Sequence, residues 1–146
     1  MAKFVVHGLD ELYEATSKAK KIPQSVTGSI LQKMGEVLKF HVTKEALARK
    51  IWDTGEVVRS IRLAKPKIRD DGGSIAVTFT GSRTRGKTTT RNAEIAFVNE
   101  YGKRGRGPKK GQAARPFVKE ATERSADEAN AAGTEELHRW LNEIGL

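Results

Sequence analysis

One stretch of the chain, residues 81–88 (GSRTRGKT), matches the phosphate-binding expression G-x-x-x-x-G-K-[ST] at every position. In a P-loop the backbone amides hold phosphates, the lysine reaches the terminal phosphates, and the hydroxyl holds magnesium. That chemistry requires a helix to begin at Lys87-Thr88, whereas residues 88–92 are polar and rich in β-branched threonine. Nucleotide binding is therefore a remote alternative, and a basic hairpin loop is the favoured interpretation.

The remaining residues that could do chemistry are scattered. His7, His41 and His138 lie far apart, without partners at metal-ligand spacing. The chain has no cysteine, so it has no thiolate metal site, disulfide or thiol nucleophile, which suits a cytosolic origin. No serine lies in a nucleophile-elbow context. Asp70-Asp71 is typical of a turn rather than of an acid–base pair. We therefore expect no enzyme activity, no metal and no cofactor.

Charge is the most informative property of this sequence. The chain has 146 residues and a net charge of +9. Residues 83–115 hold 10 basic and 2 acidic side chains, and residues 116–146 hold 3 basic and 7 acidic ones. The excess falls in two glycine-containing segments that we expect to be flexible loops, residues 81–92 and 102–114. Their basic members are Arg83, Arg85, Lys87, Arg91, Lys103, Arg104, Arg106, Lys109 and Lys110.

The sequence leaves open what these basic loops contact. Lysine and arginine in loops suit sequence-independent binding to nucleic acid phosphates. Aromatic residues are nearly absent from both segments, so stacking on single-stranded bases is not indicated. An acidic protein surface is the other candidate, because complementary charge guides docking.

Two helices and a small sheet are predicted to position these loops. Pro23 is well placed to begin a helix of about 25 residues, since its apolar residues recur at spacings of three to five. Gly28 and Gly35 lie inside that helix, where glycine either weakens it or admits a close neighbour. Pro116 is expected to open a C-terminal helix, divided near Gly133-Thr134.

The intervening segments favour antiparallel strands. Residues 61–68 predict a strand with an edge or bulge at Pro66, followed by an Asp-Gly-Gly turn at 71–73 and an alternating strand at 74–80. Residues 93–101 are predicted to be a strand that pairs back on 74–80. That pairing would put the two basic loops at opposite ends of the strand, roughly 25–30 Å apart.

These elements define an α+β fold: a small antiparallel β-sheet packed by a long helix in the N-terminal half and by a C-terminal helix. The length suits a single domain over residues 1–146. A short strand at 3–7 and a short helix from Asp10 are predicted before the long helix. No apolar run reaches the ~18–20 residues of a membrane span, and the apolar start is too short for a secretory signal.

Three stretches, in matching order and spacing, carry a family resemblance. They are residues 53–61 (DTGEVVRSI), residues 96–102 (AFVNEYG) and residues 114–121 (ARPFVKEA). Together they resemble the tailed-bacteriophage head–tail joining family, also called neck, tail-completion or minor tail component proteins. The motif positions are Asp53, Thr54, Gly55, Ser60, Glu100, Tyr101, Gly102, Arg115, Pro116 and Phe117.

The resemblance implies a non-catalytic structural protein of a virion or prophage, a ring subunit between the portal connector and the tail tube. Its implied partners are copies of itself, with six per ring as one option, and neighbouring connector and tail-tube or tail-terminator proteins. DNA in the channel is a further candidate partner, and no membrane is. The implied location is the virion, with the host cytoplasm during assembly. A basic nucleic-acid-binding module is the alternative.

Elementary chemistry gives several of these positions a local role. Asp53 can cap the turn at residues 56–60, and Gly55 permits a φ angle that other residues avoid. Phe117 is placed to fix the C-terminal helix to the sheet. Glu100 is expected to pair with Arg115 or Arg59.

Overall fold

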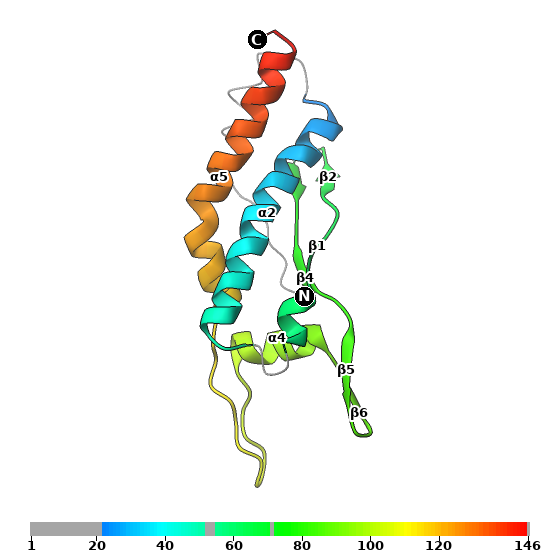
Figure 1. The fold of residues 1–146 in the computed structure, drawn as a ribbon, viewed down its shortest axis with the longest axis vertical. Coiled ribbons are helices and arrows are strands. Elements are labelled where there is room, and N and C mark those ends of the chain that lie inside the picture. The colour runs from blue at the N-terminus through cyan, green and yellow to red at the C-terminus, as the bar shows by residue number, and fades with distance from the viewer. Residues whose placement is uncertain (1–21, 52–54, 71, 146) are drawn as a thin grey trace.

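A computed structural model of the chain describes residues 22–51, 55–70 and 72–145. Two long helices, α2 (Gln24–Ala48) and α5 (Phe117–Glu143), lie side by side along an elongated molecule (Figure 1). A narrow β-ribbon packs against α2, and α4 (Asn92–Tyr101) crosses one end of the body. The predicted α+β class, with antiparallel strands packed by a long helix and a C-terminal helix, is confirmed. Within the described residues, neither long helix has the apolar stretch that crossing a bilayer requires.

Helix α2 has the start and the 25-residue length that its apolar spacing predicts. Gly35 lies on its buried side, facing the ribbon. A Cβ atom at Gly35 would lie 2.7 Å from the Cδ1 atoms of both Leu63 and Ile75. The glycine therefore admits the ribbon to close contact with the helix, which offsets its low helix propensity.

Helix α5 begins after Pro116 as predicted, but the predicted division near Gly133-Thr134 is wrong. The helix continues unbroken for 27 residues, to Glu143. A Cβ atom at Gly133 would lie 2.9 Å from both Cγ and Sδ of Met34. This glycine therefore marks a close crossing with α2 rather than a helix end.

The ribbon is one long hairpin with a bulge. Strand β1 (Ile61–Leu63) pairs antiparallel with β4 (Val77–Phe79), and β2 (Lys67–Arg69) pairs with β3 (Gly72–Ser74). Between the two pairings, residues 64–66 oppose only residues 75–76. Pro66 therefore lies in a β-bulge, as its missing N–H predicts.

Residues 93–101 form helix α4, so the predicted strand there is wrong. β4 pairs with β1 and not with this segment. The buried residues of α4 are Asn92, Ala96, Asn99 and Glu100, which share one helix face at spacings of one to four. A short apolar run suits a strand or a helix equally, and the alanine and glutamate residues favour the helix.

A hydrophobic cluster joins the C-terminal half of α2 to β1, β4, α4 and the start of α5. It also includes the short helix α3 (Glu56–Arg59), which precedes β1. A second cluster fills the other end of the α2–α5 crossing. The strand predicted at 3–7 and the helix predicted from Asp10 lie outside the described residues. The buried members of the first cluster are Leu38, Val42, Ala46, Ile51, Val57, Ile61, Val77, Ala96, Phe117 and Ala121.

Candidate functional site

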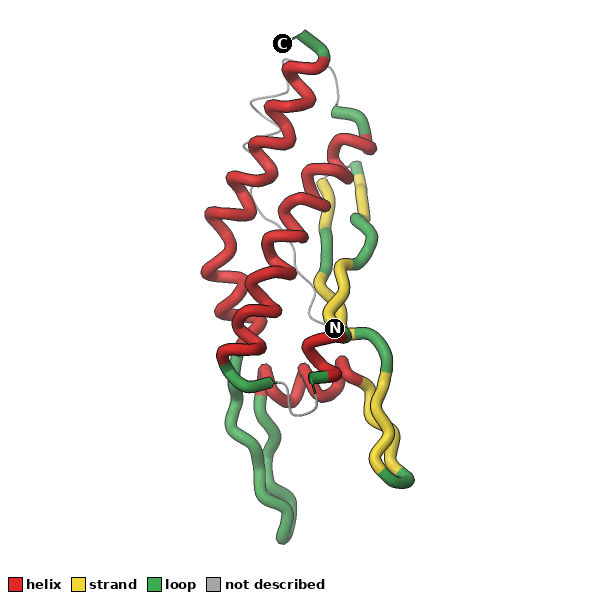
Figure 2. The backbone as a smooth tube through the Cα atoms, viewed as in Figure 1, coloured by secondary structure: helices red, strands yellow, loops and turns green. Residues whose placement is uncertain are grey.

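Both basic segments form hairpins that project from the same end of the molecule (Figure 2). The first arm, residues 82–91, consists of β5 (Ser82–Arg85) and β6 (Thr88–Arg91). The second arm, residues 103–112, is bridged at Lys103–Gln112 and Arg106–Lys109. Helix α4 joins the two arms and is only about 15 Å long. The prediction that the two segments lie at opposite ends of a strand is therefore wrong.

The first arm contains the sequence that matches the P-loop expression. Lys87 lies in a two-residue turn with Gly86, whose φ is +61°, and Thr88 begins β6. The Lys-Thr pair thus does not begin a helix, and the favoured hairpin interpretation describes this segment. The hydroxyls of Thr84 and Thr89 are 2.9 Å apart across the strands. The run of β-branched threonines around a glycine was the available sequence signal for these strands.

Asn92 attaches the first arm to the body. Its backbone N–H donates to the carbonyl of Gly81 at 3.0 Å, and its side-chain Nδ2 donates to the carbonyl of Thr80 at 2.9 Å. Asn92 is buried and begins α4. One side chain therefore fixes the direction in which the hairpin leaves the ribbon, a role that its sequence context did not indicate.

The second arm is a narrow ribbon built on glycine. A Cβ atom at Gly105 would lie 2.8 Å from the carbonyl oxygen of Lys109, and one at Gly111 would lie 2.6 Å from that of Lys103. Side chains at these positions would push the two strands apart. The backbone turns tightly at Gly107, whose φ is +58°. The flexibility predicted for this segment stays a prediction.

Asn99 and Arg115 attach the second arm. The Asn99 side-chain oxygen accepts hydrogen bonds from Gln112 Nε2 at 3.0 Å and from the Arg115 guanidinium. The Arg115 backbone N–H donates to the Asn99 carbonyl at 2.6 Å. The same guanidinium also donates to the Arg49 carbonyl at the end of α2, at 3.2 Å. Arg115 thus connects α2, α4 and the second arm.

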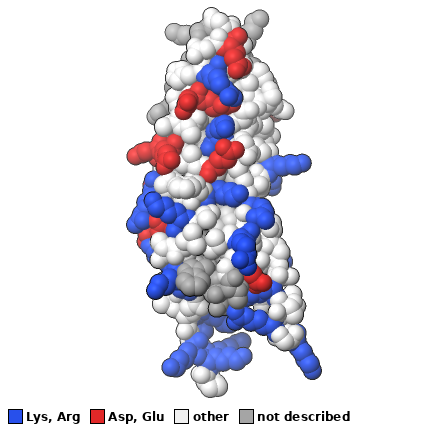
Figure 3. Space-filling view, in the orientation of Figure 1, with Lys and Arg blue, Asp and Glu red and all other residues white. Residues whose placement is uncertain are grey.

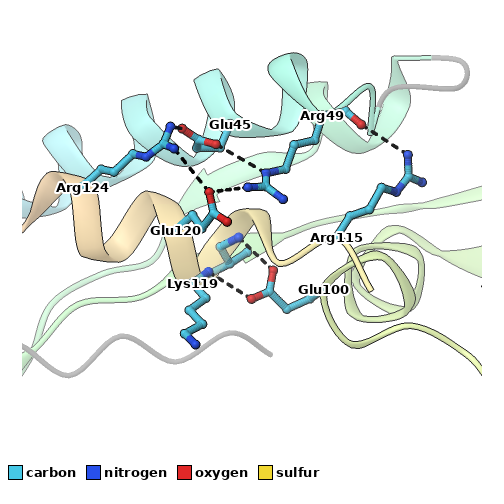
Figure 4. Close-up of polar contacts among 8 residues, drawn as sticks. Glu45, Arg49, Glu100, Arg115, Lys119, Glu120 and Arg124 are labelled. Atoms are coloured by element: carbon cyan, nitrogen blue, oxygen red, sulfur yellow. Dashed lines mark hydrogen bonds and ion pairs between the residues drawn. The ribbon is translucent and has the colours of Figure 1, made fainter. Parts of the chain in front are cut away.

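Glu100 caps helix α5 from a different helix (Figure 4). Its carboxylate accepts hydrogen bonds from the backbone N–H of Val118 at 2.8 Å and of Lys119 at 3.0 Å. Helix α5 has no side-chain cap of its own. A carboxylate at a helix N-terminus satisfies amides that lack partners and interacts favourably with the helix dipole. The Arg115 guanidinium binds Asn99 and the Arg49 carbonyl instead, so the predicted pairing of Glu100 with Arg115 is wrong. The alternative pairing with Arg59 stays a prediction.

Replacing Glu100 with alanine is expected to lower the free energy of unfolding by about 2–3 kcal/mol, because two partly buried amides at the start of α5 would lose a charged acceptor. Urea unfolding followed by circular dichroism measures the loss. Glu123→Ala is the matched control, since Glu123 is exposed on the same helix. Equal effects of the two substitutions would contradict the capping role.

Four charged side chains connect α2 and α5 beside this cap (Figure 4). Arg49 and Arg124 each bind both Glu45 and Glu120. The Glu45 side chain is buried, and the Glu120 side chain is half-buried. The hydrogen bond from Arg49 is the main cause that lowers the pKa of Glu120, and the same contact raises the pKa of Arg49. Both shifts favour the charged forms of the pair in the folded protein.

The lowered pKa of Glu120 gives a pH-dependent contribution to stability. It is fully present above the usual carboxyl pKa of 4.5 and is lost as pH falls through the lower pKa of the folded state. Glu120→Gln should therefore destabilise the protein at about pH 6 and much less at about pH 3. Urea titrations of both proteins across this range measure the difference. A pH-independent difference would contradict the assignment.

Basic side chains gather at the end that bears the arms, and most of the visible acidic ones lie farther along the body (Figure 3). Lys87 and all five basic residues of the second arm are exposed. Arg91 forms an ion pair with Glu94 at 3.1 Å, and both side chains are largely exposed. The charge asymmetry of the sequence thus becomes a separation of charge along the long axis.

Two aromatic side chains are exposed on the helix that joins the arms. Phe97 is 57% exposed and Tyr101 is 68% exposed, and their ring centroids are 4.7 Å apart. Both line a mainly apolar cavity of about 260 Å³. In the strand predicted at residues 93–101, Phe97 and Tyr101 would lie roughly 13 Å apart. The helical spacing of four brings the two rings together. The other lining residues are Thr78, Phe79, Ala93, Ala96, Glu100 and Val118.

The motif stretches at 53–61, 96–102 and 114–121 meet at the base of the arms. Val57, Ala96 and Phe117, one from each stretch, belong to the same buried cluster. Gly55 has a φ of +77°, as predicted. The buried Ser60 hydroxyl donates to the Val57 carbonyl at 2.6 Å, closing α3. Asp53 and Thr54, with the predicted Asp53 cap, lie outside the described residues.

Among the described residues, no group of three or more His, Asp or Glu side chains is arranged to hold a metal ion. His41 on α2 contacts Glu128 on α5 at 2.6 Å. The predicted absence of metal, cofactor and catalysis stays a prediction.

The chain matches no family model, no curated protein sequence and no solved structure. The head–tail joining resemblance therefore depends on its three motif stretches alone.

Proposed function

We propose that the chain is a structural protein of a phage or prophage virion, a ring subunit at the head–tail junction that acts by self-assembly and by docking to neighbouring rings. The observation that carries this proposal is the convergence of the three motif stretches. Their residues share one buried cluster, and hydrogen bonds of Asn99, Glu100 and Arg115, from the second and third stretches, hold the base of the second arm and the start of α5. This arrangement holds the two arms in fixed positions, where their basic side chains can contact other molecules.

The functional residues in this proposal divide into two groups. Glu100, Gly102, Arg115 and Phe117 hold the base of the second arm and the start of α5. The basic residues of the two arms make the contacts. Connector, tail-tube or tail-terminator proteins are the proposed neighbours, and the virion is the proposed location.

The proposal is tested by deleting the gene from a phage or prophage that carries it. We expect complete heads and tails that remain unjoined under the electron microscope, with joining restored by the wild-type gene. Mass spectrometry of purified virions should detect the chain at a ring-like copy number. Normal joining without the gene, or absence of the chain from purified virions, would contradict the proposal.

The second candidate function is binding of nucleic acid, which the clustering of both arms at one end favours. The nine basic residues of the two arms then act on one surface rather than two. Binding through phosphates predicts an affinity that falls steeply with salt. Fluorescence anisotropy of a labelled duplex of about 30 base pairs at ~50 and ~150 mM salt measures this. Negligible binding at the higher salt would remove this candidate.

A further inference from the structure

We propose that the two arms and the Phe97–Tyr101 pair form one docking surface, and that its occupant is the acidic ridge of α5 in a second copy of this chain. The acidic ridge is defined as Glu123, Asp127, Ala131 and Glu135, which follow one another at a spacing of four. This inference deepens the proposed function, on which it rests, by naming the contact between subunits.

The apolar part of the surface favours a protein occupant. Phe97 and Tyr101 expose more than half of their side chains and line the apolar cavity beside α4. Phosphate groups of a DNA backbone offer no apolar partner for such a cavity. Exposed aromatic residues are enriched in the cores of protein interfaces. The Phe97–Tyr101 pair lies on the helix that joins the two basic arms. This surface therefore fits a partner that is acidic and partly apolar.

The acidic ridge has that chemistry. Its three carboxylates are exposed, and within the described residues none of them forms an ion pair. Glu123 and Asp127 are like charges one helical turn apart, an arrangement that destabilises an isolated helix. Cations from another molecule would relieve that repulsion. Ala131 leaves room between the carboxylates for an aromatic ring.

The dimensions of the two surfaces also match. From Glu123 to Glu135 the helix rises roughly 18 Å. The second arm, with five residues on each side of its turn, extends roughly 15 Å and carries five exposed basic side chains. The arms cannot reach the ridge of their own chain, because they point away from the body beyond the start of α5 (Figure 1). The contact must therefore form between copies.

A contact between two different surfaces of the same chain is heterologous, and repeating it by a closing rotation generates a ring. Electrostatic docking of this kind weakens as salt rises. The isolated protein should accordingly form oligomers at low salt and high concentration.

Two charge-reversed variants test the contact. The first is Lys109→Glu with Lys110→Glu in the second arm, and the second is Glu123→Lys with Asp127→Lys in the ridge. In the arm variant, residues 109 and 110 have the same sign as the ridge, and in the ridge variant, residues 123 and 127 have the same sign as the arms. The dissociation constant of each variant alone should therefore rise at least about tenfold. When the two variants are mixed, the acidic arm residues of the first can contact the basic ridge residues of the second. Native mass spectrometry and sedimentation velocity should then show assembly that neither variant gives alone.

Matched controls separate this contact from general effects of charge and hydrophobicity. Lys33→Glu with Lys44→Glu makes the same charge change on exposed residues of α2 and should leave assembly unchanged. Tyr101→Ser should weaken assembly, whereas Phe40→Ser, at another exposed aromatic residue, should not.

Several outcomes would overturn the inference. One is wild-type protein that stays monomeric up to about 100 µM at low salt. Another is a mixture of the two variants that assembles no better than either alone. A third is an arm variant that loses DNA binding and keeps its oligomers, which would make DNA the occupant. Each of these leaves the proposed function standing if the gene deletion still gives unjoined heads and tails.

Discussion

Replacing Phe117 with alanine is expected to lower the free energy of unfolding by about 3–5 kcal/mol, the usual cost of removing a buried aromatic ring. Phe117 is completely buried, and its ring packs edge-on against Phe79 with centroids 5.9 Å apart. It is the first residue of α5 and lies in the cluster that also holds Val57 and Ala96. One substitution would thus create a cavity where the three motif stretches meet.

The measurement is urea unfolding of the isolated protein, with Phe40→Ala as the matched control. Phe40 is 62% exposed, so its loss should change the unfolding free energy by about 0.5 kcal/mol or less. Hydrogen exchange should also show early opening of the start of α5 in the Phe117 variant. A loss no larger than that of the control would contradict the view that this cluster holds the base of the arms.

The long helices could be predicted from sequence because their signals are repetitive. Helix α2 presents apolar residues over seven turns, and prolines stand directly before α2 and α5. The bulge at Pro66 was also predictable, since proline lacks the N–H that a ladder requires. In each case a physical property of the sequence, either the repeated apolar spacing or the missing N–H of proline, is compatible with only one local structure.

Residues 93–101 show where such reasoning stops. These nine residues include six hydrophobic ones, which fit a strand by alternation and a helix by spacing. The choice is made by tertiary partners: Asn99 binds Gln112 and Arg115, and Glu100 caps α5. None of these partners lies within ten residues, so the local sequence does not contain the deciding interactions.

Because residues 93–101 were predicted to be a strand, the sequence did not predict that the two basic segments form one candidate site. With a strand at 93–101, the two basic segments lie at opposite ends and form no common surface. With helix α4 in its place, both arms leave the same end of the body, and Phe97 and Tyr101 lie together between their attachment points. The positions of Lys and Arg along the sequence correctly predicted that the basic residues gather in two segments. Their combination into one surface depends on the conformation of the connecting helix.

Gly102 is the residue at which backbone geometry most strictly limits side-chain identity, and Gly102→Ala is expected to cost about 3 kcal/mol or more. Its φ is +78° and its ψ is 179°, a region that is essentially restricted to glycine. A Cβ atom there would also lie 2.8 Å from the carbonyl oxygen of Gln112 and 2.9 Å from the amide nitrogen of Ala114. Both neighbours are backbone atoms, so no side-chain rotation can relieve the clash.

Gly107→Ala in the same arm provides the matched control for Gly102→Ala. Gly107 also has a positive φ, +58°, but nothing lies within 4 Å of its missing Cβ. Its substitution should cost only about 1 kcal/mol, the usual penalty for a left-handed alanine. Urea unfolding measures both losses, and hydrogen exchange at Lys103 and Gln112 reports whether the arm detaches. Because the second arm supplies five basic residues to the proposed contact, Gly102→Ala should also weaken self-assembly more than Gly107→Ala does. Equal costs for the two variants would show that the close backbone approach does not hold the arm.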